Sequence, residues 1–395
     1  MKTSEIRRII GEAYPEIRAL RQDLHQHPET KFEEVRTARQ VVKHLKKLKI
    51  PCKTKVGRTG VVGVLRGKRR GPCVALRADM DALPLSERNR FSYRSVNEGK
   101  MHACGHDGHT ANLVGVAHVL SRLKEHLRGS VKLLFQPAEE SGIQGGAELM
   151  IADGALTDPK PDVIFGLHTS HVYPLGTVAS VAGPALASAD FFDIRIRGRG
   201  AHAAYPHKGI DPIVIAGAVV EALQTIASRR IDPLQPVVVT VGQITGGTAR
   251  NIIPDTVTLG GTTRAYDRAV RQTLKQQLQR IPKDIARAMG GSAEVDYMEC
   301  YPAVINDRKA FDFLKQVATD VLGRKRFLEA APSMGGEDFA FYLEKTPGVF
   351  FWLGNGSPER QIHSPTFNFN DQALKTGMLV MTELVLNWPA QSLKG

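Results

Sequence analysis

Residues 101–127 read "MHACGHDGHTANLVGVAHVLSRLKEHL", and this stretch holds both a candidate site and a clear helix signal. From Asp107 onward, apolar residues such as Leu113, Val116 and Leu120 recur every three or four positions, which predicts an amphipathic helix. The ten residues at its start contain three histidines, one cysteine and two glycines. Polar groups gathered where a helix begins are typical of α/β proteins.

Short apolar runs bounded by glycine, proline or polar residues predict strands on both sides of this helix. They read "GVVGVLRG" (60–67), "GPCVALRAD" (71–79), "SVKLLFQPAEE" (130–140) and "PDVIFGLH" (161–168). We expect the first two to pair with each other, and helical periodicity predicts further helices at 5–24 and 33–49. The alternation predicts an α/β domain with a mixed sheet flanked by helices.

The pattern changes near residue 187. Strands are expected in "ADFFDIRIRG", "PVVVTVGQI", "TVTLGGTTRAY" and "AEVDYMEC", with helices over 210–229 and 268–289. This βαβ-βαβ order is that of a ferredoxin-like α+β domain. We therefore expect a discontinuous first domain, residues 1–186 and 301–395, with residues 187–300 inserted into it.

Composition narrows the protein class. With 395 residues, 42% hydrophobic and 24% charged, the chain is typical of a globular protein, and its start has no apolar signal-peptide core. The four cysteines are scattered, which favours reduced thiols and a cytoplasmic location. The net charge of +13 keeps nucleic-acid binding open, but the basic residues are dispersed and not interleaved with aromatic ones, so a solvated basic surface is the simpler interpretation. No run is long and apolar enough to predict a membrane span.

Candidate metal ligands lie at several predicted strand ends and in one late loop. Two imidazoles, a thiolate and a carboxylate suit zinc or a neighbouring divalent ion. An isolated Cys-x-His pair can also simply pack at a strand–helix junction, and an adjacent acidic pair is often a solvated helix start. The candidates are Cys104, His106, Glu139, Glu140, His168 and His363.

Other histidines fit a site less well. His25 and His27 follow a charged helix instead of an apolar strand, so we interpret them as structural. His171 is expected in a loop near the pocket, and the roles of Glu337 and Asp338 stay open. The chain has no His-Glu-x-x-His helix, no GxGxxG after a strand and no phosphate loop, which argues against gluzincin, Rossmann and nucleotide-binding interpretations.

Nine motifs in order resemble one known family over nearly the whole chain. They are "ALRADMDALPL", "MHACGHDGHT", "QPAEE", "GLHT", "GRGAHAAYPHKGIDPI", "NIIPD", "GTTRAYD", "GGEDFAFY" and "HSPTF". Together they resemble the co-catalytic metallo-amidohydrolases and carboxypeptidases related to aminoacylases, hippurate hydrolases and auxin-conjugate hydrolases. The resemblance implies a catalytic α/β domain carrying an inserted lid and dimerisation domain.

The resemblance also implies roles for the residues of the first domain. Glu139 would be the general base and then the general acid, and Asp81 would support the metal site. Asp79 stands where wider relatives have a histidine ligand, and the stretch "SGIQ" is longer than in many relatives, which leaves the shape of the acyl pocket open. The implied ligands of two divalent ions are Cys104, His106, Glu140, His168 and His363.

In the inserted domain, His202 resembles the histidine that reaches the active site of a partner subunit and polarises the scissile carbonyl. Asn251 and Arg264 resemble the groups that bind the substrate carboxylate. The implied reaction is metal-dependent hydrolysis of N-acyl amino acids by a homodimer or higher homo-oligomer, with zinc, manganese, cobalt or nickel as the ion. A metallocarboxypeptidase or dipeptidase is the alternative. From a different class, a zinc-stabilised nucleic-acid-binding protein without catalysis is a further alternative.

Overall fold

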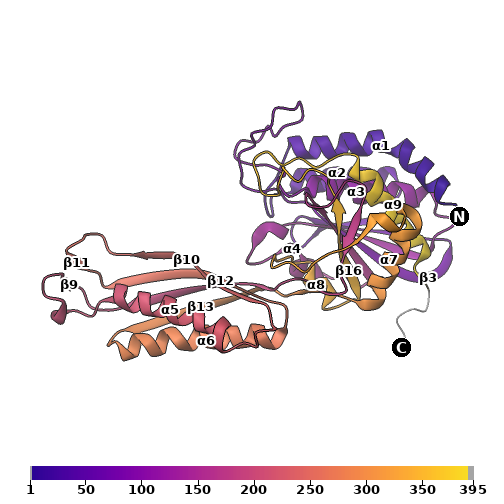
Figure 1. Cartoon of the computed structure of the whole chain (residues 1–395). Helices are drawn as coiled ribbons and strands as arrows, with labels where there is room; N and C mark the ends of the chain where they lie inside the picture. Colours follow the sequence, from indigo (N-terminus) through magenta and orange to yellow (C-terminus); the bar gives the residue numbers. More distant parts are fainter. Residues whose placement is uncertain (1, 390–395) are drawn as a thin grey trace. The chain divides into compact units, whose positions relative to one another are not determined.

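The computed structural model describes residues 2–389, which divide into two compact units (Figure 1). The first unit holds the described parts of Met1–Ala185, Ile305–Pro332 and Asp338–Gly395. The second holds Leu186–Val304 and Ser333–Glu337. The divisions thus fall at 185/186 and 304/305, where we expected 186/187 and 300/301, and a short loop near residue 335 groups with the second unit.

The first unit is built on an eight-stranded mixed sheet with the order β1-β2-β4-β3-β5-β16-β6-β15. Its four middle strands, β4, β3, β5 and β16, run parallel, so their carboxyl ends meet at one edge of the sheet. The strands are β1 (Cys52–Val56), β2 (Gly60–Arg66), β3 (Arg69–Asp79), β4 (Arg128–Gln136), β5 (Val163–Ser170), β6 (Val178–Ser180), β15 (Phe327–Glu329) and β16 (Gly348–Gly354).

Helices flank this sheet and share its apolar core. The predicted helices at 5–24, at 33–49 and from Asp107 correspond to α1, α2 and α3. In α1, the buried residues Ile6, Ile10 and Ile17 recur at helical spacing, which explains why this polar sequence packs as a helix. The helices are α1 (Thr3–Gln26), α2 (Val35–Lys47), α3 (His106–Arg122), α4 (Gly146–Ala152), α7 (Arg308–Leu322), α8 (Ala340–Leu343) and α9 (Ala373–Asn387), with the 3-10 turns η1 (Glu139–Ser141) and η3 (Arg324–Arg326).

The expected pairing of the first two strands is wrong. Strand β4 lies between β2 and β3, antiparallel to the first and parallel to the second. The carboxyl-terminal half of β3 is buried on both faces, from Cys73 to Asp79, which is typical of a central strand between two parallel neighbours. The short connection between β2 and β3 therefore does not form a hairpin, and Gly67 N–H bonds to Gly129 O at 2.8 Å instead.

The second unit has a four-stranded antiparallel sheet with the order β10-β12-β8-β13 and two helices. Alternate residues of β8, Phe192, Ile194 and Ile196, enter its core. A separate two-stranded sheet joins β9 and β11. The elements of this unit are β8 (Ala189–Arg197), β9 (Ala201–His202), η2 (Pro206–Lys208), α5 (Pro212–Arg229), β10 (Val237–Gly246), β11 (Ile252–Ile253), β12 (Thr256–Ala265), α6 (Arg268–Ala288) and β13 (Ser292–Tyr301). Two further strands, β7 (Gly183–Leu186) and β14 (Val304–Asn306), pair with each other and belong mostly to the first unit.

Helix α5 is the one described helix that is long and apolar enough, by length and composition alone, to cross a membrane. A single such helix is weak support for a span. One face of α5, with Ile215, Val219 and Leu223, packs into the core of the second unit, whereas Ile213 and Val214 on another face are exposed. Helix α5 is therefore buried on one face only.

Candidate metal centre

The candidate ligands come together at the carboxyl edge of the first unit's sheet. Cys104 and His106 stand just before and at the first residue of α3, Glu140 follows β4, and His168 lies near the end of β5. His363 enters from the loop that follows β16. Glu140 and His168 therefore lie at or just after the ends of parallel strands, Cys104 and His106 lie at the start of a helix, and His363 lies in a loop.

Two overlapping groups of ligand atoms account for these five residues. Cys104, His106 and His168 form one group, and Cys104, Glu140 and His363 form the other, with the atoms of each group within 4.8 Å of one another. Cys104 Sγ lies 3.3 Å from His168 Nε2, and His363 Nε2 lies 3.0 Å from Glu140 Oε1. Since both groups contain Cys104, its thiol stands at the centre of the cluster.

Two glycines of the motif make this arrangement possible in different ways. Gly105 has φ +92°, the left-handed region, and this turn lets Cys104 and His106 reach the same centre although they are two residues apart. Gly108 lies inside α3, where a Cβ atom would collide with the ring of Phe369. The missing side chain of Gly108 therefore serves close packing.

Both buried histidines are oriented by their Nδ1 atoms. His168 Nδ1 donates to the carbonyl of Thr169 at 2.6 Å, and His106 Nδ1 lies 3.3 Å from Asp81 Oδ1. Such contacts fix the tautomer and direct the Nε2 lone pair into the site, as in metal-binding histidines generally. His106 Nε2 is buried and has no hydrogen-bond partner among the described residues. An unpaired imidazole nitrogen facing a thiol and carboxylates fits a divalent cation.

The charges around the cluster are strongly coupled. Burial, together with Glu140 and Glu139, raises the pKa of the Cys104 thiol well above its usual range. Burial opposes a charge on His106, but Asp79 and Asp81 outweigh it and raise its pKa to about 10. A divalent cation in the cluster would supply the positive charge that the thiolate and carboxylates need.

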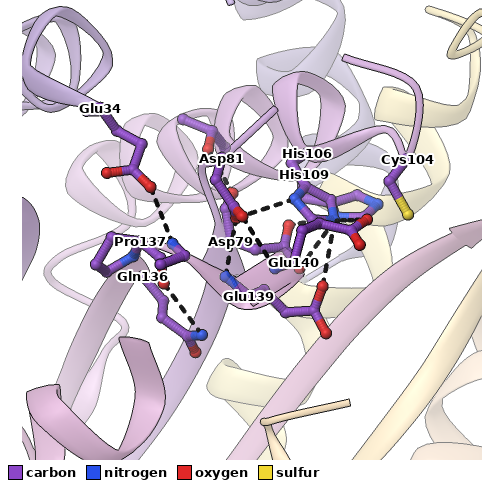
Figure 2. A network of polar contacts seen from close by, with 12 residues as sticks. Glu34, Asp79, Asp81, Cys104, His106, His109, Gln136, Pro137, Glu139 and Glu140 are labelled. Carbon is purple, nitrogen blue, oxygen red and sulfur yellow. Dashed lines mark hydrogen bonds and ion pairs between the residues drawn. The ribbon is translucent and has the colours of Figure 1, made fainter. Parts of the chain in front are cut away.

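Glu139 stands beside the ligand cluster on the turn η1 (Figure 2). Its side chain is 8% exposed, and its Oε2 lies 3.9 Å from His106 Nε2. Asp81 accepts the backbone N–H of Glu139 on Oδ1 at 3.0 Å and that of Glu140 on Oδ2 at 2.9 Å. Asp81 therefore holds His106 and the Glu139–Glu140 backbone in one arrangement.

A buried polar network under the cluster contains a residue to which the sequence interpretation gave no role. His109 Nδ1 lies 2.6 Å from Asp79 Oδ1, and its Nε2 accepts the N–H of Thr169 at 2.8 Å. Arg77 donates to Asp79 Oδ2 at 2.6 Å and to Asp338 Oδ1 at 3.0 Å. The one signal for this role was the position of His109, one turn of α3 after His106.

Three further histidines that the sequence fitted less well to a site, His25, His27 and His171, belong to none of the possible metal-binding groups in the described residues. His25 is buried, with Nδ1 2.8 Å from Asp107 Oδ2 and Nε2 3.0 Å from Glu87 Oε1, so both ring nitrogens are occupied. His27 Nδ1 donates to the carbonyl of Asp23 at 2.9 Å. His171 lies in the segment after β5.

The three substrate-binding candidates belong to the second unit. His202 on β9 is exposed and pairs with Ile252 of β11, and Ala203 N–H bonds to Asn251 O at 3.0 Å. The β9–β11 pairing therefore brings His202 and Asn251 close together. Arg264 stands apart on β12, half-buried, and its Nη1 is buried without a hydrogen-bond partner in the described chain.

Comparison with known proteins identifies the family. Residues 75–387 match the family described as Peptidase family M20/M25/M40. The chain belongs to this family. It is 42% identical over 366 residues to an Arabidopsis thaliana protein named IAA-amino acid hydrolase ILR1-like 4, covering 91% of this chain and 82% of that one. A Bacillus subtilis N-acetyl-L-cysteine deacetylase is 41% identical, covering 90% of this chain and 84% of the relative.

The fold has solved counterparts in the same family. A Bacillus subtilis protein described as a dinuclear metal binding peptidase from the M20 family superposes with a TM-score of 0.83 at 34% identity, covering 95% of this chain and 98% of that chain. The chain is therefore an M20-family hydrolase with the fold of a dinuclear metal-binding peptidase. Because the chain belongs to a family of hydrolases, the alternative of a non-catalytic nucleic-acid-binding protein is not supported.

Proposed function

We propose that this M20-family hydrolase cleaves the amide bond of N-acyl amino acids in a metal-dependent reaction. The observation that carries the proposal is that the carboxylate of Glu139 lies directly beside two ligand groups that share Cys104. A general base next to ligands for two ions is the arrangement that amide hydrolysis by an activated water requires. The names N-acetyl-L-cysteine deacetylase and IAA-amino acid hydrolase support an N-acyl amino acid as the substrate.

We assign two divalent ions to the cluster, with Cys104, His106, Glu140, His168 and His363 as their ligands. A thiolate, imidazoles and a carboxylate suit zinc first, and manganese, cobalt or nickel as alternatives. When bound, the ions supply a Lewis acid for the scissile carbonyl and a water of lowered pKa.

Glu139 performs the proton transfers in this proposal. Its carboxylate accepts a proton from the attacking water and then gives that proton to the departing amine, so one side chain serves both steps. Asp81 keeps Glu139 in place by holding its backbone N–H. Because the side chain of Glu139 is 8% exposed, little bulk water competes for its proton.

We assign the second unit to a ferredoxin-like lid and dimerisation domain. Its sheet has the β-α-β-β-α-β order, and β10 is an edge strand with mostly exposed residues. Exposed Ile213, Val214 and Ile244 favour a second copy of the chain as the partner that covers them. His202 then stabilises the developing oxyanion in a partner's site, and Asn251 and Arg264 bind the substrate carboxylate.

A metallocarboxypeptidase or dipeptidase activity is the second candidate. It is supported by the name of a Saccharolobus solfataricus relative, thermostable carboxypeptidase 2, which is 39% identical and covers 93% of this chain and 94% of its own. We also propose a cytoplasmic location, for which the support is that all four cysteines are free.

The test is amine release from N-acetyl, N-benzoyl and dipeptide substrates, using metal-stripped protein and protein reloaded with single divalent ions. Reloading is expected to restore turnover, with N-acyl substrates ahead of peptides that have free N-termini. Glu139→Gln is expected to lower kcat by about 1,000-fold while metal content stays unchanged. Near-normal kcat in this variant would refute the role of Glu139, and a preference for free N-termini would favour the dipeptidase.

A further inference from the structure

Three consecutive backbone N–H groups, at residues 138–140, donate hydrogen bonds to two buried carboxylates (Figure 2). Asp81 accepts the N–H groups of Glu139 and Glu140, as described above. The N–H of Ala138 bonds to Glu34 Oε1 at 2.9 Å, across 104 residues of sequence. The segment that carries the proposed base is therefore held from two sides, and Glu34 is the residue on the second side.

Ala138 needs such support because of its backbone conformation. Its φ of +54° and ψ of 40° lie in the left-handed region, which costs energy for a residue with a Cβ atom. It follows Pro137, which has no N–H to donate, and it precedes Glu139 directly. The turn at Ala138 therefore sets the direction in which Glu139 leaves the end of β4.

Glu34 is itself rigidly placed. It lies in the loop before α2, is fully buried, and accepts the N–H of Phe32 on Oε1 at 2.9 Å. On its other oxygen it accepts the hydroxyl of Thr59 at 2.5 Å. With both oxygens held, the carboxylate is a fixed acceptor for the Ala138 peptide.

We propose that Glu34 is a positioning residue for Glu139, which it serves by holding the Ala138 peptide in its left-handed turn. The inference rests on the proposed function, since it takes Glu139 as the base. Glu34 acts through the peptide backbone and takes no part in proton transfer. What matters is the place of Oε1, and a charge on Glu34 is not needed.

Two variants distinguish the effect of the position of Glu34 Oε1 from the effect of a charge on Glu34. Glu34→Gln keeps the chain length and an oxygen for the N–H groups of Ala138 and Phe32, while its amide can donate to Thr59. Glu34→Asp keeps the charge but draws the oxygen back by one carbon–carbon bond, about 1.5 Å. We expect Glu34→Gln to retain near-normal kcat and Glu34→Asp to lower kcat by about 100-fold with little change in KM.

The matched control is Glu29→Asp in the same loop. Glu29 accepts the N–H groups of Arg36 and Thr37 at 2.9 and 2.8 Å and has no bond to residues 138–140. Shortening it disturbs the start of α2, next to Glu34, without removing a bond to residues 138–140, and we expect its kcat to match the wild type. If Glu29→Asp lowers kcat as strongly as Glu34→Asp, the effect belongs to the loop and the proposal fails.

Amide hydrogen exchange of residues 136–141 gives a readout that does not depend on turnover. We expect faster exchange there in Glu34→Asp than in Glu34→Gln, with metal content equal to the wild type in both. Unchanged exchange, loss of metal, or a higher kcat in Glu34→Asp than in Glu34→Gln would each overturn the proposal. Failure of the proposed function shows separately, as an active Glu139→Gln.

Discussion

His109 and Asp79 share a contact of 2.6 Å between Nδ1 and Oδ1 at the base of the ligand cluster. The other nitrogen of His109 accepts the N–H of Thr169, so neither ring nitrogen has a lone pair left for a metal ion. His109 therefore stays outside the ligand set although it lies close to His106, with ring centroids 5.3 Å apart. Its role is to tie Asp79, at the end of β3, to the end of β5 beside His168.

The first prediction concerns the contacts of His109 with Asp79 and Thr169. His109→Ala leaves the carboxylate of Asp79 with one fewer partner and Thr169 N–H without an acceptor, so we expect the free energy of unfolding to fall by about 2 kcal/mol. Asp79 Oδ2 is already 3.8 Å from His106 Nε2, and a freed Asp79 would compete for that nitrogen. Metal content after dialysis should therefore fall as well.

Urea unfolding and elemental analysis measure these two effects. His171→Ala is the control, because His171 lies in the segment just after β5 and belongs to neither ligand group. We expect that variant to keep its metal. Full metal content in His109→Ala would show that the contact between His109 and Asp79 does not protect the site.

The second prediction concerns metal stoichiometry. Cys104 belongs to both ligand groups, whereas His168 and His363 each belong to one. We therefore expect His168→Ala and His363→Ala to lose one ion each after chelation and reloading, and Cys104→Ala to weaken both. Elemental analysis against protein concentration measures the count. Two tightly held ions in Cys104→Ala would contradict a shared thiolate.

The third prediction concerns pH and stability. Burial, and then the neighbouring charge of Asp81, raises the pKa of Glu34 from 4.5 to about 7. Between these values the folded chain keeps a proton that the unfolded chain loses. The contribution of Glu34 to the free energy of unfolding is thus fully present below pH 4.5 and is lost as pH rises through 7.

Glu34→Gln removes this titration. Its free energy of unfolding should fall less than that of the wild type between pH 4.5 and pH 7.5, by about 3 kcal/mol. Urea unfolding at several pH values in this interval tests the expectation. Parallel stability curves for the two proteins would show that Glu34 titrates alike in the folded and unfolded states.

Much of the site could be predicted because several of its candidate side chains lie at or just after the ends of strands. Glu140 and His168 each come after or at the end of an apolar run, and the Cys-Gly-His spacing of 104–106 marks a turn that a helix cannot make. These signals are local in sequence. Residue type and position relative to an expected strand were sufficient to select candidate ligands, whereas the division of roles between Glu139 and Glu140 came from the family resemblance.

The parts that could not be predicted depend on contacts between distant segments. Strand β4 inserts between β2 and β3, and nothing in the short link from Arg66 to Arg69 indicates this. The bond between Glu34 and Ala138 joins a loop before α2 to the end of β4. The left-handed turn at Ala138 was equally hidden, because alanine is not a residue type that marks positive φ.

The fourth prediction concerns which subunit supplies the His202 that acts in a given active site. If His202 acts in the site of a partner subunit, the His202→Ala and Glu139→Gln defects of a mixed dimer fall in the same active site and leave the other site intact. We expect His202→Ala and Glu139→Gln to be almost inactive alone and to regain activity when mixed and allowed to exchange subunits. Random exchange makes half of the dimers hybrid, and each hybrid has one intact site of two, so about 25% of wild-type activity should return.

Light scattering on each protein must first show a dimer, and differently tagged subunits show that hybrids have formed. Mixing His202→Ala with wild-type protein serves as the control, since it creates sites whose only defect is His202. If tagged hybrids form and activity stays at the level of the separate variants, His202 does not act across the subunit boundary. A role for His202 in its own subunit would then be tested by its kcat alone, because oxyanion stabilisation changes kcat and leaves substrate binding nearly unaltered.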